Sequence, residues 1–163
     1  MNDYKTGFMI RAGEEKDAGL IMSMIRELAV FEGLDHEITA TVEDIRKSLF
    51  EKTQAEIIIG WLKEEPVAFA LYFYNYSTFL GKAGVYLEDL YVREKYRKQG
   101  FGKEMLRYLA RTAVERRCER LDWLCLDKNA PAIEFYKNLG AHVLDDRRVF
   151  RMSGDRLSRF AGV

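Results

Sequence analysis

The chain has 163 residues, of which 48% are hydrophobic and 13% aromatic, and this is enough apolar material for a folded domain with its own core. Lysine and arginine together number 26, and so do aspartate and glutamate, so the formal net charge is zero. A general nucleic-acid-binding protein usually carries a basic excess, and the composition therefore argues against that class.

The first half of the chain predicts a strand, two helices and then three strands. Residues 8–12 (FMIRA) have strand character, and residues 17–31 repeat apolar side chains at helical spacing. Residues 41–44 (TVED) match a capping box, which predicts the start of a second, short helix. Three strands joined by short turns follow, and strands joined in this way form an antiparallel meander; they cover residues 55–62, 67–76 and 83–92.

The pattern changes after the third of these strands. Residues 101–117 carry an apolar stripe at helical spacing, and residues 121–126 (LDWLCL) are almost continuously apolar, as in a strand covered on both faces. This strand–helix–strand order predicts a parallel β-α-β unit with a buried strand pair. A helix over residues 129–140 follows, and two short final strands are expected at 141–144 (AHVL) and 148–152 (RVFRM).

We therefore expect a single mixed α/β domain over residues 1–163, in which a mostly antiparallel sheet contains one central parallel β-α-β unit. No apolar run approaches the roughly 20 residues of a membrane span, and the N-terminal residues lack the apolar core of a signal peptide. Cys118 and Cys125 show neither CxxC nor histidine spacing, which is typical of reduced, structural cysteines in a cytoplasmic protein. The sequence predicts no metal site, no membrane partner and no nucleic-acid partner.

The bend before the helix at 101–117 holds an unusual loop. Its pattern is R-x-x-G-x-G, formed by Arg97, Gly100 and Gly102. A helix N-terminus offers unpaired N–H groups and a positive dipole end, and glycines let an anion approach the backbone. The loop therefore predicts a phosphate cradle, although a tight turn with solvated charges also fits the loop alone. It matches neither the P-loop nor the dinucleotide-binding fingerprint.

A second segment, NAPAIEFYKNLGA (129–141), begins with Asn129, which can cap a helix or hydrogen-bond a ligand amide. Tyr136 follows about two helical turns later, and alone it would be interpreted as a residue at the core edge. R-x-x-G-x-G after a strand, with N-x-x-A-x-x-F-Y-x-x-x-G about 27 residues further on, resembles the GNAT acetyltransferases. Three stretches are similar to the diamine acetyltransferase branch, which includes spermidine/spermine and thialysine N-acetyltransferases: IRELAVFE (25–32), YLEDLYV (86–92) and FYKNLGA (135–141).

The resemblance implies that acetyl-CoA is the cosubstrate. In this family the strand before the loop pairs with the pantetheine arm, which assigns that role to Leu90, Tyr91 and Val92. The loop would bind the pyrophosphate through Arg97, Lys98, Gln99, Gly100, Phe101, Gly102 and Lys103. The family often has a small residue where this chain has Lys98 and Gln99, but the spacing is kept. Asn129 and Ala132 would flank the pantetheine, and Tyr136 would be the general acid.

The chemistry of the acceptor points to carboxylates. Acetyl transfer needs a neutral amine, whereas an alkylammonium group has a pKa of about 10, so a base or a water path must remove a proton. Glu88 is the best candidate because it alternates onto the strand face of Leu90 and Val92. Polyamines are extended cations that need spaced carboxylates. The predicted acceptor contacts are Phe31, Glu32, Glu88, Asp89 and Trp123, with Asp145 and Asp146 as further acidic candidates and Arg147 or Arg148 for the carboxylate of a lysine-like acceptor.

The sequence therefore predicts an N-acetyltransferase that moves an acetyl group from acetyl-CoA directly to the primary amine of a small polyamine or a lysine-like amine. Two alternatives remain: a protein or peptide N-acetyltransferase, and a non-catalytic acyl-CoA-binding module. Tyr136 and Glu88 argue against the binding module, because binding alone needs no proton-transfer groups. A homodimer is expected from the resemblance only.

Overall fold

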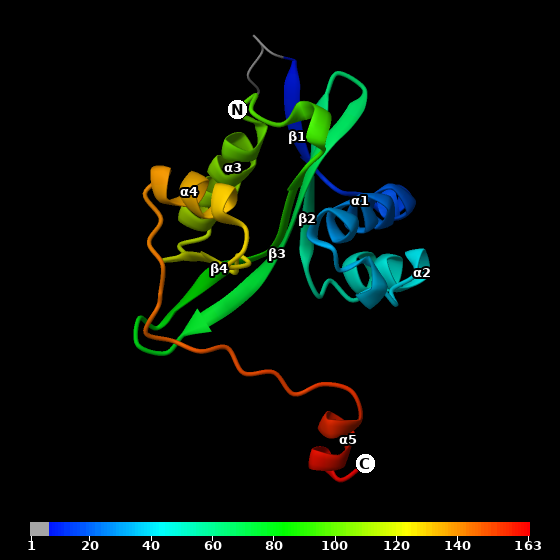
Figure 1. Ribbon diagram of the computed structural model, residues 1–163, viewed down its shortest axis with the longest axis vertical. Coiled ribbons are helices and arrows are strands. Elements are labelled where there is room, and N and C mark those ends of the chain that lie inside the picture. Colours follow the sequence, from blue (N-terminus) through cyan, green and yellow to red (C-terminus); the bar gives the residue numbers. More distant parts are fainter. Residues whose placement is uncertain (1–6) are drawn as a thin grey trace. The chain divides into compact units, whose positions relative to one another are not determined.

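The computed structural model describes residues 7–163, and Figure 1 shows the course of the chain. The chain divides into two compact units between Leu124 and Cys125. The single domain that we expected over residues 1–163 therefore stays a prediction. No helix within residues 7–163 is long and apolar enough to cross a membrane.

The first unit is built on a five-stranded sheet in the order β1-β2-β3-β4-β5. Neighbours among the first four strands pair antiparallel, whereas β4 and β5 pair parallel. The predicted mixed α/β class, with a mostly antiparallel sheet and one parallel β-α-β unit, is confirmed. The strands are β1 (Phe8–Ala12), β2 (Glu56–Leu62), β3 (Glu65–Ser77), β4 (Lys82–Val92) and β5 (Leu121–Trp123).

Helices cover both faces of this sheet: α1 and α2 lie on one side and α3 on the other (Figure 1). The helices of the unit are α1 (Ala18–Glu32), α2 (Val42–Arg46) with a π-helical extension (Lys47–Glu51), and α3 (Phe101–Glu115). Short 3-10 helices occupy Glu15–Asp17, Asp35–Glu37 and Glu94–Tyr96. On the α1 side the core joins Ile21 and Met24 to Ile59 and Phe69, and on the other side Met105 of α3 is fully buried.

Local sequence explains where two of these helices start and stop. At the start of α2 the backbone N–H of Asp44 donates to Thr41 Oγ1 at 3.2 Å, and the backbone N–H of Thr41 donates to Asp44 Oδ2 at 2.9 Å. This is the predicted capping box. Helix α1 ends at Gly33, whose φ of 74° lies in the left-handed region that favours glycine. Glu32 is therefore held in the last turn of α1.

The β4–β5 pairing is shorter than predicted. It joins Val85 to Leu121 and ends with Leu87 opposite Trp123. The strand expected over residues 121–126 therefore stops at Trp123, and its three residues are only half-buried. The physical reason lies in β4, whose register shifts after Leu87, so that residues beyond Trp123 have no ladder to join. On this side, β4 beyond Leu87 has no strand partner within the part of the chain that the structure describes.

The second unit contains two helices, α4 (Ala130–Asn138) and α5 (Asp155–Ala161). The two strands predicted at residues 141–144 and 148–152 are wrong, because no strand forms in this unit. A strand needs a neighbour to pair its backbone N–H and C=O groups, and apolar character alone does not supply one. The side chains of Val143, Val149 and Phe150 are exposed.

Candidate functional site

The loop before α3 has the geometry of an anion cradle. Gly100, at the N-cap, has a φ of 88°, and Lys98 has a φ of 61°, so the chain turns through the left-handed region twice. Among residues 7–163 no side chain caps the start of α3, and a Cβ atom placed on Gly100 would meet none of their atoms within 4 Å. The first N–H groups of the helix therefore have no side-chain cap among these residues, and the helix dipole favours an anion there.

Two of the predicted loop residues direct their side chains away from this cradle. Phe101 is buried and stacks on Phe8, with ring centroids 4.5 Å apart. Arg97 turns toward α1: its Nε donates to the carbonyl oxygen of Val92 at 2.9 Å, and its Cζ lies 4.0 Å from the ring centroid of Phe31. Both residues can therefore serve the cradle through their backbone only. Lys98, Gln99 and Lys103 are exposed.

The strand before the loop has an open edge. Leu90, Tyr91 and Val92 pair with β3 on one side, but no strand of the described chain pairs with them on the other. An extended ligand can add to such an edge through backbone hydrogen bonds. The Arg97 side chain already occupies the carbonyl oxygen of Val92. The available edge therefore lies mainly between Glu88 and Tyr91.

A β-bulge lies where the two strands separate. Tyr72 pairs with Leu87 and Leu71 pairs with Asp89, so Glu88 has no partner in the register. This interrupts the strict alternation from which we placed Glu88 on the face of Leu90 and Val92. Bulges commonly redirect side chains in this way, and here Glu88 is exposed. The sequence carries no local signal for the bulge.

Three carboxylates gather between this bulge and the end of α1. Asp89 is half-buried, and burial, together with the nearby charges of Glu88 and Glu32, raises its pKa to about 6. All three residues were predicted as acceptor contacts, and the charges of Glu88 and Glu32 both act on the Asp89 carboxyl. Such a cluster favours a cation, which would relieve the repulsion, and Asp89 can exchange a proton near neutral pH. We call Glu32, Glu88 and Asp89 the acidic cluster.

A cavity of about 480 Å³ adjoins the last turns of α1 and the end of β4. It contains Phe31 and four charged side chains that the sequence analysis did not connect: Arg26, Glu27, Glu94 and Arg97. Glu27 is bound by Arg93, whose Nε and Nη2 lie 2.9 and 2.7 Å from its two carboxylate oxygens. We call this cavity the α1 pocket. The only sequence signal was the spacing of Ser23, Arg26, Glu27 and Val30 on one helical face.

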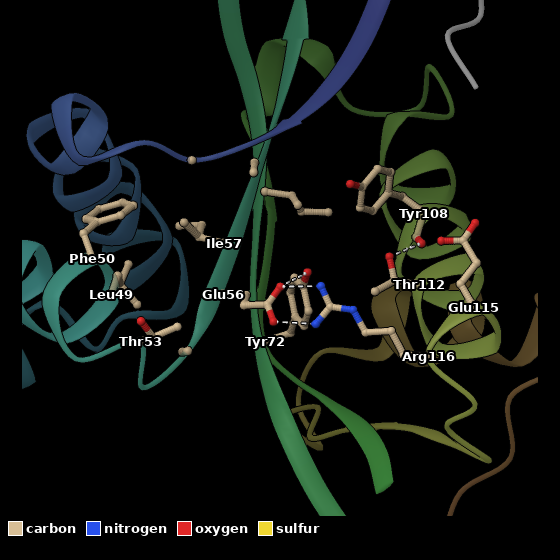
Figure 2. Close-up of a pocket in the computed structure, with 14 residues that line it drawn as sticks. Leu49, Phe50, Thr53, Glu56, Ile57, Tyr72, Tyr108, Thr112, Glu115 and Arg116 are labelled. Atoms are coloured by element: carbon tan, nitrogen blue, oxygen red, sulfur yellow. Dashed lines mark hydrogen bonds and ion pairs between the residues drawn. The ribbon is translucent and has the colours of Figure 1, made fainter.

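A second cavity, of about 310 Å³, lies near the other end of α3 (Figure 2). Arg116 points at Glu56, with Nη1 2.7 Å from Oε1, and the Tyr72 hydroxyl donates to Glu56 Oε2 at 2.9 Å. Burial alone would raise the pKa of Glu56, but the hydrogen bonds from Arg116 and Tyr72 outweigh it and lower that pKa. Because the Glu56 carboxylate is already paired, we interpret the contacts in this cavity as a structural link between β2 and α3. It lies about 20 Å from the loop at the start of α3.

The remaining predicted residues lie apart from these groups in the sequence. Trp123 is half-buried on β5 and pairs with Leu87. In the second unit Asn129 caps α4, where its Oδ1 accepts a hydrogen bond from the Ala132 N–H at 3.4 Å. Tyr136 is half-buried on the same helix, with its ring centroid 5.3 Å from that of Phe135. Asn129 thus has the capping role, one of the two roles predicted for it.

Two curated proteins and one solved structure are similar to this chain over most of its length. Bovine (Bos taurus) thialysine N-epsilon-acetyltransferase is 36% identical over 168 residues, which cover 94% of this chain and 97% of that protein. L-ornithine N5-acetyltransferase NATA1 of Arabidopsis thaliana is 30% identical and covers 91% of this chain and 85% of its own length. Among solved structures, an integron cassette protein from the mobile metagenome of V. cholerae superposes with a TM-score of 0.81 at 23% identity, covering 96% of this chain and 99% of its own.

A protein-family model identifies the chain more broadly. The model of the acetyltransferase (GNAT) family matches residues 22–141, a range that includes the loop before α3, the β4 bulge and α4. The resemblance on R-x-x-G-x-G and N-x-x-A-x-x-F-Y is therefore confirmed. The chain belongs to the acetyltransferase (GNAT) family and is an acetyl-transferring enzyme.

Proposed function

We propose that the protein transfers an acetyl group from acetyl-CoA directly to the primary amine of a small polyamine or lysine-like amine. The observation that carries this proposal is the acidic cluster, because Glu32, Glu88 and Asp89 form an anionic site for an ammonium group beside the open edge of β4. The names of two relatives support an amine acceptor, since one is a thialysine and the other an L-ornithine acetyltransferase.

Acetyl-CoA would bind along β4 and the loop that follows. The uncapped N–H groups at the start of α3, with Gly100 and Gly102, would receive the pyrophosphate. The open backbone edge near Leu90 and Tyr91 would pair with the pantetheine amides, as an added strand does. Asn129 and Ala132 are proposed to flank the same arm.

The acceptor ammonium must lose a proton before it attacks. We propose that the proton leaves through the Glu88–Asp89 pair, with Glu88 as the base or as the anchor of a water path. The raised pKa of Asp89, about 6, supports this proposal because efficient general bases titrate near the working pH.

Attack of the neutral amine on the thioester carbonyl gives an oxyanion, which a backbone N–H on β4 would stabilise. The carbon–sulfur bond then breaks, and Tyr136 is proposed to donate its phenolic proton to the departing thiolate. The products are the N-acetylated amine and CoA. Because the transfer is direct, Cys125 has no role as a nucleophile.

Three further expectations belong to the same proposal. Trp123 and Phe31 are proposed to line the acceptor site, and the chain is proposed to act as a homodimer in the cytoplasm. A protein or peptide acceptor is the alternative substrate. The proposed acceptor class is favoured over it by the clustered carboxylates, which suit a compact cation.

The test is an acceptor screen with the purified protein. Acetyl-CoA is mixed with each of a panel of polyamines, diamines, basic amino acids, aromatic amines and peptides, while free thiol release is measured. We expect the small aliphatic amines to be acetylated fastest. Faster acetylation of a peptide would replace the acceptor class, and binding of acetyl-CoA without turnover on any amine would contradict the proposed activity.

A further inference from the structure

We propose that the α1 pocket binds a small monocarboxylate with an apolar body. This inference goes beyond the proposed function, because no residue of the acidic cluster lines the pocket. The cavity volume of about 480 Å³ lies within the range of about 300–1,000 Å³ that is usual for small-molecule sites. Charged and apolar side chains both line the cavity, and together they define the chemistry of the ligand.

Two arginines supply the hydrogen-bond donors of the α1 pocket. Arg97 uses Nε for the carbonyl oxygen of Val92 at 2.9 Å, whereas its two Nη groups donate to no group within residues 7–163. Arg26 forms no ion pair with any of the same residues. A guanidinium group binds a carboxylate through two parallel hydrogen bonds. The donors of both side chains are therefore available to a bound carboxylate.

The other charges of the pocket limit the charge of the ligand. Glu27 is neutralised by Arg93, whose Nε and Nη2 lie 2.9 and 2.7 Å from its two carboxylate oxygens. The pocket then keeps the two positive charges of Arg26 and Arg97 and the one negative charge of Glu94, which give a net charge of +1. A ligand with a single negative charge matches this balance, whereas Glu94 would repel a dianion more strongly.

Three side chains supply the apolar surface of the pocket: Val30, Phe31 and Tyr91. Val30 is 65% exposed and Phe31 is 52% exposed, so a bound molecule can cover both. The Phe31 ring is held in place by Arg97, whose Cζ lies 4.0 Å from the ring centroid. An aliphatic chain bound here would remove apolar surface from water. A carboxylate joined to such a chain therefore uses both the donors and the apolar wall.

The experiment uses hexanoate as the probe, because it joins one carboxylate to an apolar chain. Hexanamide removes the charge, acetate removes most of the chain, and inorganic phosphate offers anionic oxygens without a chain. In an NMR titration of isotope-labelled protein, hexanoate should bind at least about tenfold more tightly than hexanamide, since a hydrogen bond to a charged group is worth roughly that much. It should also bind about tenfold more tightly than acetate, through burial of the chain. The amide signals that shift should cluster in residues 23–31 and 91–97.

Two substitutions should change the affinity for hexanoate in opposite directions. Arg26→Gln should weaken binding about three- to tenfold, a modest effect because Arg26 is exposed and water screens its charge. Glu94→Gln should strengthen binding about two- to fivefold, because it removes the carboxylate that repels the ligand. The control variant Lys52→Gln removes an exposed positive charge outside the pocket and should leave the affinity unchanged. An unfolded variant could only lose affinity, so the gain in Glu94→Gln remains decisive if Arg26→Gln does not fold.

Saturating CoA should leave the affinity for hexanoate unchanged, because Arg97 is proposed to serve the cosubstrate loop through its backbone alone. Loss of hexanoate binding in the presence of CoA would overturn the inference, since the pocket would then belong to the cosubstrate site. Equal affinity for hexanoate and hexanamide, tighter binding of phosphate than of hexanoate, or unchanged affinity in both pocket variants would also overturn it. Acetylation of no amine would contradict the proposed function and leave this inference standing.

Discussion

The guanidinium carbon of Arg97 lies 4.0 Å from the ring centroid of Phe31, and this contact joins the loop before α3 to the last turn of α1. The same side chain donates through Nε to the carbonyl oxygen of Val92 at 2.9 Å. Its backbone therefore starts the proposed pyrophosphate cradle while its side chain orders the helix end that carries Glu32. One residue thus connects the two proposed binding sites.

We expect Arg97 and Phe31 to be energetically coupled. A double-mutant cycle with Arg97→Met, Phe31→Leu and the double variant should give a coupling of about 0.5–1 kcal/mol in the free energy of unfolding, the usual size of a partly exposed cation–π contact. Urea denaturation of the four proteins measures it. Additive effects of the two substitutions would mean that the contact contributes no stability. Arg97→Met should also raise the KM for the amine, because the end of α1 loses its support.

The cradle is tested by two glycines at equivalent helix positions. Gly102 is the second residue of α3, and Gly19 is the second residue of α1. A Cβ atom added at Gly19 would meet no atom of the described chain within 4 Å. Gly102→Val should weaken acetyl-CoA binding at least about tenfold, because the side chain stands between the anion and the N–H groups. Gly19→Val should bind as the wild type does. If calorimetry finds equal affinity for acetyl-CoA in both folded variants, the assignment of this loop as the pyrophosphate-binding site is wrong.

Asp89 should make the protein less stable as the pH rises. Its pKa is about 6 in the folded chain against an ordinary value of 3.8, so the folded state holds more protons than the unfolded state between these values. The free energy of unfolding therefore falls as the pH increases through this window and stays low above it. Two pKa units correspond to about 3 kcal/mol at most.

Asp89→Asn should remove this penalty. At pH 8 we expect a gain of about 1–3 kcal/mol relative to the wild type, and near pH 4 little difference. The variant should bind the amine more weakly, because it lacks a carboxylate of the acidic cluster. Urea denaturation at several pH values measures the first effect, with the exposed Asp35→Asn as control. A constant difference between variant and wild type at all pH values would contradict the assignment.

Glu88→Gln should lower turnover mainly at neutral pH. As the pH rises toward the pKa of the amine, about 10, more of the acceptor is already neutral and the need for a base decreases. We therefore expect the loss in kcat/KM to shrink between pH 7 and 9. Glu64→Gln, in the exposed turn between β2 and β3, is the control for loss of a negative charge. A pH–rate profile parallel to that of the wild type would mean that water or Asp89, and not Glu88, removes the proton.

The parts of the fold that depend on near neighbours in the chain were predictable. The capping box of Thr41 and Asp44 needs four consecutive residues, and the helical spacing of α1 and α3 is likewise local. The two predicted final strands failed for the opposite reason. An alternating apolar segment becomes a strand only beside a partner, and no pattern within residues 141–152 shows whether that partner exists.

The candidate site was likewise predictable only where it depends on local sequence. The loop glycines and the acidic residues could be named from the sequence, because their types state their chemistry. The bulge that exposes Glu88 depends on the register between β3 and β4, and the direction of the Arg97 side chain depends on Phe31, which is distant in sequence. The α1 pocket was missed because Arg26 and Glu94 gain their meaning only when α1 packs against the end of β4.

Tyr136→Phe decides whether this tyrosine is the general acid or a packing residue. The substitution keeps the ring and removes only the hydroxyl, so the contact with Phe135 should persist and stability should change little. If Tyr136 donates the proton to the departing thiolate, kcat should fall about 100- to 10,000-fold, the usual range for general acid catalysis, while acetyl-CoA affinity is retained. A packing tyrosine without its hydroxyl should keep turnover within a few-fold of the wild type. Tyr108→Phe, a half-buried tyrosine on α3 that lines the second cavity, is the matched control and should show only that small change. Steady-state kinetics with calorimetry of acetyl-CoA binding on both variants separates the two roles, and near-normal turnover in Tyr136→Phe would exclude Tyr136 as the acid.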